Sequence, residues 1–277
     1  MRFAICNETF QGWTWDRICE FAAATGYAGI EIAPFTLAED VRGLDAAQRE
    51  RIRRAAEGNG LAIVGLHWLL VSPKGLSATS PDAETRRATA DYLVALARLC
   101  SDLGGSVMVF GSPAQRRIEE GVSREDALRW FAETLHPALD YAANFGISIC
   151  VEPLPAPEAN FIMTLDEAAT ILRLLDHPAA RTILDVKSAS AERQDIPALI
   201  EAYGPLIRHV HANDANRRGP GFGETDFVPI LRALRRIGYS GYISVEVFDY
   251  TPDPETIARA SLVYLEDCLC RASHGDL

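Results

Sequence analysis

Long apolar runs and positive charge are both scarce in this sequence, and each scarcity argues against one class of protein. No window of the 277 residues approaches 18 uninterrupted apolar residues, so we expect no transmembrane helix. Lys and Arg number 27 against 38 Asp and Glu, which leaves a formal net charge of −11. Because nucleic acids and anionic membranes attract basic surfaces, we expect neither as a partner.

Targeting and dinucleotide motifs are also missing. No N-terminal segment combines a basic region, an apolar run and a small-residue cleavage site. The six cysteines are scattered and fit reduced thiols, so we expect a cytoplasmic location. No Gly-x-Gly-x-x-Gly pattern follows the first expected strand, which argues against a dinucleotide-binding fold.

A regular alternation of strand and helix patterns fills the chain. Short β-branched and apolar runs predict strands over residues 3–6, 29–32, 62–66, 106–110, 148–152, 182–185, 209–211 and 242–246. Amphipathic patterns predict helices over 15–25, 83–103, 124–145, 165–175, 196–203, 227–237 and 254–270. Glycines that can stop a helix precede the strands, at Gly26, Gly60, Gly104, Gly146 and Gly238.

This alternation predicts an α/β fold with a parallel sheet covered by helices. Eight strand and helix units favour a closed (β/α)8 TIM barrel over an open sheet. Such a barrel takes about 250 residues, so we expect a single domain over residues 1–277.

Four acidic or imidazole side chains stand where the last four expected strands run out. They are Glu152, Asp185, His211 and Glu246. The carboxyl ends of barrel strands converge at one mouth, where three carboxylates would repel one another unless a cation joined them. Oxygen-rich ligation with one imidazole suits Mn²⁺, Mg²⁺ or Co²⁺ better than a structural zinc, which prefers thiolates. The sequence therefore predicts one divalent metal site.

These strand ends lie in motifs that resemble the xylose isomerase-like TIM-barrel superfamily. The similarity is to its branch of sugar and sugar phosphate isomerases and epimerases, which includes ketose 3-epimerases and hydroxypyruvate isomerase. It spans the whole chain, and the matching motifs are Val151-Glu152-Pro153, Leu184-Asp185-Val186, His209-Val210-His211-Ala212-Asn213-Asp214, the run from Arg217 to Glu224, and Val245-Glu246-Val247.

The resemblance implies a metal-dependent isomerase or epimerase of a small keto-sugar or keto-polyol. Glu152, Asp185, His211 and Glu246 would hold one divalent metal, as their counterparts do in the family, with Mn²⁺ expected first and Mg²⁺, Co²⁺ or Zn²⁺ as alternatives. Glu152 and Glu246 would also exchange the proton on opposite faces of the reacting carbon, through a metal-stabilised enediolate.

The same resemblance assigns substrate contacts. Arg217 matches a family arginine near the metal, Glu158 a hydroxyl contact, and His67 a histidine that touches the sugar, with a core histidine as the alternative for His67. Apart from the resemblance, Trp68 near a strand end could pack its aromatic face against the C–H side of a sugar. Many epimerases have a histidine at the position of Ser188, and Lys187 could replace that donor. Glu31, at the end of its strand, could bind a hydroxyl or hold a neighbouring side chain.

Other functions stay open. A metal-dependent lyase or dehydratase acting on a 3-keto-glycoside or keto-inositol would use the same metal site. A three-zinc DNA-repair endonuclease of this fold needs more histidines than the six present, and the net charge opposes it. A non-catalytic barrel would not need four converging ligands. Tryptophans in loops also serve oligomer contacts, so a homo-oligomer stays open.

Overall fold

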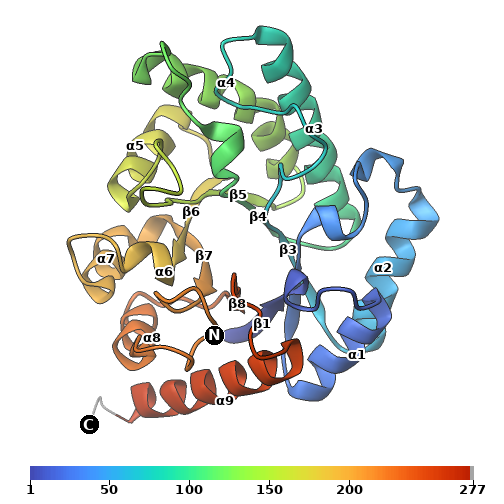
Figure 1. The fold of residues 1–277 in the computed structure, drawn as a ribbon, viewed down its shortest axis with the longest axis vertical. Coiled ribbons are helices and arrows are strands. Elements are labelled where there is room, and N and C mark those ends of the chain that lie inside the picture. The colour runs from blue at the N-terminus through green and yellow to red at the C-terminus, as the bar shows by residue number, and fades with distance from the viewer. Residues whose placement is uncertain (275–277) are drawn as a thin grey trace. The chain divides into compact units, whose positions relative to one another are not determined.

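Eight strands form a closed barrel in the computed structural model, which describes residues 1–274 (Figure 1). Their order around the barrel follows the chain, from β1 to β8. The pairs β1–β2, β3–β4, β4–β5, β5–β6, β7–β8 and β8–β1 run parallel. The expected α/β TIM barrel is confirmed.

The strands coincide closely with the predicted ones. They are β1 (Arg2–Cys6), β2 (Gly29–Ile32), β3 (Ala62–Leu66), β4 (Val107–Phe110), β5 (Ser148–Val151), β6 (Ala180–Asp185), β7 (Ile207–Ala212) and β8 (Tyr242–Val245). Most strand residues are buried, which is why they read as apolar runs rather than as alternating patterns. Glu152 and Glu246 fall one residue beyond their strands, whereas Asp185 and His211 lie within theirs.

One longer helix follows each strand along the chain. These helices are α1 (Trp15–Thr25), α2 (Ala46–Gly58), α3 (Ala83–Asp102), α4 (Arg124–Ala143), α5 (Leu165–Leu175), α7 (Ile196–Tyr203), α8 (Phe227–Arg236) and α9 (Pro254–Ser273), with the short α6 (Val186–Ala189) directly after β6. Single 3₁₀ turns occupy Asn7–Thr9, Pro34–Thr36, Val41–Gly43, Pro113–Arg116 and Gly204–Leu206. The five glycines expected to stop helices all have positive φ angles, between 68° and 113°.

Helix α2 was not predicted. Its sequence is dominated by Arg, Glu and Gln, and it buries little more than Ile52 and Ala56, so it has no apolar stripe of helical period.

The chain divides by compactness into two units, each assembled from separate segments. The first unit comprises Met1–Glu31, Arg54–Val64 and Ile183–Leu277, and in it α9 packs against α8 and α1. The second unit comprises Ile32–Arg53 and Gly65–Thr182, and in it α4 packs against α3 and α5.

No helix within residues 1–274 has the length and apolarity needed to cross a bilayer. The single-domain extent over residues 1–277, the cytoplasmic location and the homo-oligomer stay predictions.

Candidate metal centre

Three of the four predicted metal ligands meet within the first unit, at the ends of β6, β7 and β8. Strands β7 and β8 pair in parallel with His211 opposite Ser244, and the Glu246 amide donates to the Ala212 carbonyl at 3.2 Å. This register sets Glu246 beside His211, whose Nδ1 lies 3.1 Å from Glu246 Oε2. Both side chains are buried.

Asn213 ties Asp185 to the same cluster. Its Nδ2 amide donates to Asp185 Oδ2 at 2.6 Å and lies 3.4 Å from Glu246 Oε2. The other Asp185 oxygen, Oδ1, accepts from the Ser188 backbone amide at 2.7 Å, which caps α6. One neutral amide, that of Asn213, thus contacts both buried carboxylates.

The electrostatics of this cluster favour a cation. Burial raises the pKa of Asp185, and the nearby charge of Glu246 raises it further, although Lys187, His211 and Asn213 oppose the shift. Burial alone would lower the pKa of His211, but Glu246 and Glu31 outweigh it and raise that pKa well above its usual range. Repulsion between buried carboxylates is the strain that a bound divalent cation relieves.

Glu152 is positioned by its own neighbours in the second unit. A Cβ at Gly111 would overlap with Glu152 Oε2, so the absence of a side chain at residue 111 makes room for the carboxylate. The fully buried Arg116 donates to the carbonyls of Glu152 at 2.7 Å, Gly111 at 2.6 Å and Ile162 at 3.3 Å. Burial lowers the pKa of Arg116 to about 10, against the opposing charges of Glu152 and Glu167. The guanidinium therefore stays protonated at neutral pH.

All four predicted ligands form one group. Glu152, Asp185, His211 and Glu246 each offer a ligand atom, and these atoms lie within 4.8 Å of one another, with every residue buried. Three carboxylates and one imidazole are a donor set that fits a divalent cation of the Mn²⁺ or Mg²⁺ type. The sequence prediction of a shared site is consistent with this grouping, and the roles of the residues stay predictions.

Glu31 and His209 lie next to His211, although the sequence leaves the role of Glu31 open between two alternatives and assigns His209 no role of its own. Glu31 Oε2 lies 2.7 Å from His209 Nε2, and Glu31 Oε1 lies 3.2 Å from His211 Nε2. Burial opposes ionisation of Glu31, but the charges and hydrogen bonds of both histidines hold its pKa well below its usual range. The available signal was the spacing of His209 and His211, since strand residues two apart share a face.

Two predicted substrate residues come together on Phe248. Lys187 Nζ lies 4.6 Å from the centre of that ring and Arg217 Cζ lies 5.5 Å from it. Arg217 has a φ of 72°, and its carbonyl accepts from the amides of Phe248 and Asp249. This loop conformation therefore holds the Arg217 backbone against Phe248, which lies two residues after Glu246. The buried Ser188 contributes its backbone amide to Asp185.

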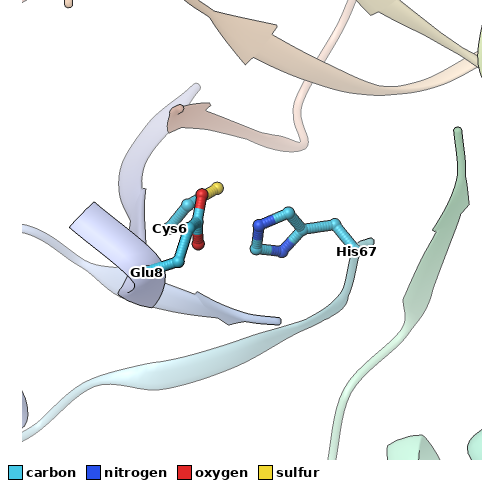
Figure 2. A group of neighbouring side chains, drawn as sticks. All are labelled: Cys6, Glu8 and His67. Atoms are coloured by element: carbon cyan, nitrogen blue, oxygen red, sulfur yellow. The ribbon is translucent and has the colours of Figure 1, made fainter. Parts of the chain in front are cut away.

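His67 belongs to a separate polar group. Cys6, Glu8 and His67 offer ligand atoms within 4.8 Å of one another, and Figure 2 shows the Glu8 carboxylate facing the imidazole. Trp68 has a φ of 51° and packs against Phe35, with ring centroids 6.1 Å apart. Glu158 is half-buried, and its amide donates to the Pro155 carbonyl. Their contacts with substrate stay predictions.

The fold and this site agree with what the chain is similar to. A model of the family described as "Xylose isomerase-like TIM barrel" matches residues 19–268. The chain belongs to that family. In this barrel the four candidate ligands lie at or next to the ends of four strands, β5 to β8.

Curated relatives in this family are sugar epimerases and isomerases. D-psicose 3-epimerase of Ruminiclostridium cellulolyticum is 26% identical over 233 residues, covering 83% of this chain and 76% of the relative. Fructoselysine 3-epimerase of Escherichia coli O157:H7 is 23% identical over 252 residues, covering 87% and 88%. A putative hydroxypyruvate isomerase of Streptomyces coelicolor is 25% identical, covering 86% of each chain. These relatives support an enzyme of the isomerase and epimerase class.

Solved structures establish the fold. The D-psicose 3-epimerase of Clostridium cellulolyticum H10, crystallised with D-tagatose, aligns with a TM-score of 0.85 at 21% identity, covering 97% of this chain and 99% of the other. The 3-keto-D-glucoside 4-epimerase of E. coli aligns with a TM-score of 0.84 at 21% identity, covering 97% and 100%. At such identities the likeness concerns the fold alone.

Proposed function

We propose that the chain is a divalent-metal-dependent isomerase or epimerase of a small keto-sugar or keto-polyol. The observation that carries the proposal is the grouping of three buried carboxylates and one imidazole within 4.8 Å, in a barrel whose relatives are named sugar epimerases and isomerases. A cluster of buried carboxylates is costly to maintain without a counter-charge, so a cation explains its presence.

The metal would be held by Glu152, Asp185, His211 and Glu246, with Mn²⁺ the preferred ion for this oxygen-rich set. When bound, the cation would polarise the substrate carbonyl and make the adjacent C–H bond more acidic. Asn213 keeps Asp185 and Glu246 oriented through its amide.

Glu152 and Glu246 are the proposed acid–base pair. One carboxylate removes the proton from the reacting carbon, and the other returns a proton to its opposite face, which inverts that centre. The two come from β5 and β8, and separate contacts position them: Arg116 and Gly111 for Glu152, and the Ala212 carbonyl for Glu246. Burial of both limits competing water.

Lys187, Arg217, His67, Trp68, Glu158 and Ser188 are the proposed substrate contacts. Lys187 and Arg217 both lie near the Phe248 ring, and their N–H donors suit the oxygen-rich surface of a polyol. Lys187 takes the place of the donor histidine that many epimerases have at position 188.

A second candidate is a lyase or dehydratase acting on a 3-keto-glycoside or keto-inositol. Its substrate class, not its elimination step, is favoured by the relative named 3-dehydro-D-guloside 4-epimerase, which is 28% identical over 137 residues, and by Ser188 in place of that histidine. Such an enzyme would use the same carbon deprotonation and then expel a neighbouring substituent.

The decisive experiment is a screen of unphosphorylated and phosphorylated keto-sugars, 3-keto-glycosides and keto-inositols with Mn²⁺ in D₂O, read by NMR. We expect deuterium at one carbon of the converted substrate, and an eliminated product would instead identify the lyase. Glu152→Gln and Glu246→Gln should each abolish the exchange, whereas Glu201→Gln, an exposed glutamate paired with Arg236, should not. Full exchange in either site variant would refute the two-glutamate assignment.

A further inference from the structure

Glu31 joins two imidazoles inside the first unit. Its two carboxylate oxygens face different rings, Oε2 at 2.7 Å from His209 Nε2 and Oε1 at 3.2 Å from His211 Nε2. Glu31 is the last but one residue of β2, whereas both histidines are on β7, so the side chain links two strands that are not neighbours in the barrel. All three side chains are at most 1% exposed, so bulk water does not compete for these hydrogen bonds.

His211 consequently has two different sides. Its Nε2 faces Glu31, and its Nδ1 lies 3.1 Å from Glu246 Oε2. A neutral imidazole carries one N–H and one lone pair, and a carboxylate accepts the N–H. Donation from Nε2 to Glu31 therefore leaves the lone pair on Nδ1, the nitrogen on the side of Glu246.

We propose that Glu31 is a positioning residue that holds His211 in the Nε2–H tautomer and turns its Nδ1 toward the metal. The inference rests on the metal centre of the proposed function. A carboxylate that accepts the second N–H of a metal-binding histidine fixes the ring orientation and makes the ligating nitrogen more basic.

His209 supplies the anchor for Glu31. The two imidazole rings have centroids 5.1 Å apart and are inclined at 84°, so one carboxylate can accept a hydrogen bond from each. Rotation of Glu31 away from His211 would also break its shorter contact with His209. The two histidines are two residues apart on β7, so both can contact the Glu31 carboxylate. In this arrangement His211 is the metal ligand, and His209 is the brace that holds Glu31 in place.

A direct role for Glu31 in binding metal is the competing explanation. Cys6, Glu31 and His211 also offer ligand atoms within 4.8 Å of one another, and Cys6 pairs with Glu31 across β1 and β2. A thiolate, a carboxylate and an imidazole would favour Zn²⁺, so the two explanations differ in whether Cys6 matters.

The experiment measures metal affinity without substrate, by calorimetric titration of the metal-free protein with Mn²⁺. Glu31→Gln keeps the size of the side chain but removes the carboxylate, and we expect about a 10- to 100-fold weaker Kd. His209→Gln, which keeps Glu31 but removes its brace, should weaken binding by a smaller factor. Cys6→Ser should leave the Kd within about twofold, because the positioning role does not involve the thiol.

A second readout follows the tautomer itself. In metal-free protein with ¹⁵N-labelled histidine, at a pH alkaline enough to leave His211 with one proton, wild type should keep that proton on Nε2, and Glu31→Gln should show a mixture of both tautomers. Titration with Co²⁺ should give no thiolate charge-transfer band. A band that Cys6→Ser removes would overturn the proposal in favour of direct ligation.

The outcomes separate this inference from the proposed function. If wild type binds no divalent ion, the metal centre and the function that depends on it both fail. If wild type binds Mn²⁺ and a folded Glu31→Gln variant binds it equally well, only the positioning role fails. If Glu31→Gln does not fold, His209→Gln provides the test instead. A His209→Gln variant that binds Mn²⁺ as tightly as wild type and keeps the same His211 tautomer would overturn the proposal.

Discussion

Asn213 and Asp185 form a buried hydrogen bond of 2.6 Å, from the side-chain amide to Oδ2, at the junction of β6 and β7. The same asparagine accepts from the Lys187 backbone amide through Oδ1 at 2.8 Å. One neutral side chain thereby orients a candidate metal ligand and the start of the short helix α6.

Replacement of Asn213 by alanine should destabilise the metal-free protein by about 1–3 kcal/mol, because a buried carboxylate loses its donor. Urea unfolding measures this change. Asn144→Ala is the matched control, since the amide of Asn144 donates to the Asp140 carbonyl on an exposed helix end, and it should cost no more than about 0.5 kcal/mol. Equal effects of the two variants would contradict the role given to Asn213.

Gly111→Ala should weaken Mn²⁺ binding by about tenfold or more, because the added methyl group would overlap with Glu152 Oε2 and displace that ligand. Calorimetric titration measures the Kd. Gly43→Ala is the control, since nothing lies within 4 Å of a Cβ at that position. An unchanged Kd in Gly111→Ala would mean that Glu152 does not contribute to metal binding.

Addition of metal should stabilise the fold. If the four candidate ligands bind one ion only in the native state, Mn²⁺ at 100 times its Kd adds about 2.7 kcal/mol to the free energy of unfolding. Thermal or urea unfolding with and without a chelator tests this expectation. If the free energy of unfolding does not change with Mn²⁺, a bound metal ion does not explain why these carboxylates are buried together.

Alkaline stability should depend on Tyr27, whose buried hydroxyl donates to the Ala258 carbonyl at 2.8 Å. Burial, reinforced by Cys6 and Glu266, raises the pKa of this phenol well above its usual range. Above about pH 10 the unfolded chain releases this proton while the native state keeps it, so the native state loses about 1.4 kcal/mol per pH unit.

Tyr27→Phe lacks that pH-dependent loss. Wild type should be more stable than Tyr27→Phe by about 1 kcal/mol at pH 7, and the difference should shrink and reverse as the pH rises through 11. Urea unfolding of both proteins across this pH range makes the comparison. The other tyrosines are present in both proteins, so their contributions to the pH dependence cancel in the difference. A difference that stays constant with pH would show that the phenol ionises equally in both states.

Periodicity predicted most of the fold because the strands are buried on both faces and the helices have apolar stripes. The strand over residues 29–32 and the helix over 165–175 have the predicted bounds. Helix α2 was missed because its charged residues leave no apolar face to recognise. Hydrophobic periodicity reveals a helix by its buried apolar face, so a helix that buries few apolar side chains is hard to recognise from its sequence.

The grouping of the four candidate ligands was predictable for a similar reason. Glu152, Asp185, His211 and Glu246 each follow or end an apolar strand, and parallel strands end at the same face of a barrel. Their supporting residues were not predictable. Arg116 resembles any loop arginine in the sequence, yet it is fully buried on three carbonyls.

The sequence by itself determined the order of elements, the barrel and the acidic and imidazole residues at the strand ends, since these follow from local periodicity and from residue types. Only the tertiary structure decided that Glu31 spans two histidines 178 and 180 positions away, that Asn213 orients Asp185, and that Gly111 makes room for Glu152. Such contacts depend on side-chain direction and burial, which the folded backbone sets and which no local pattern of residues encodes.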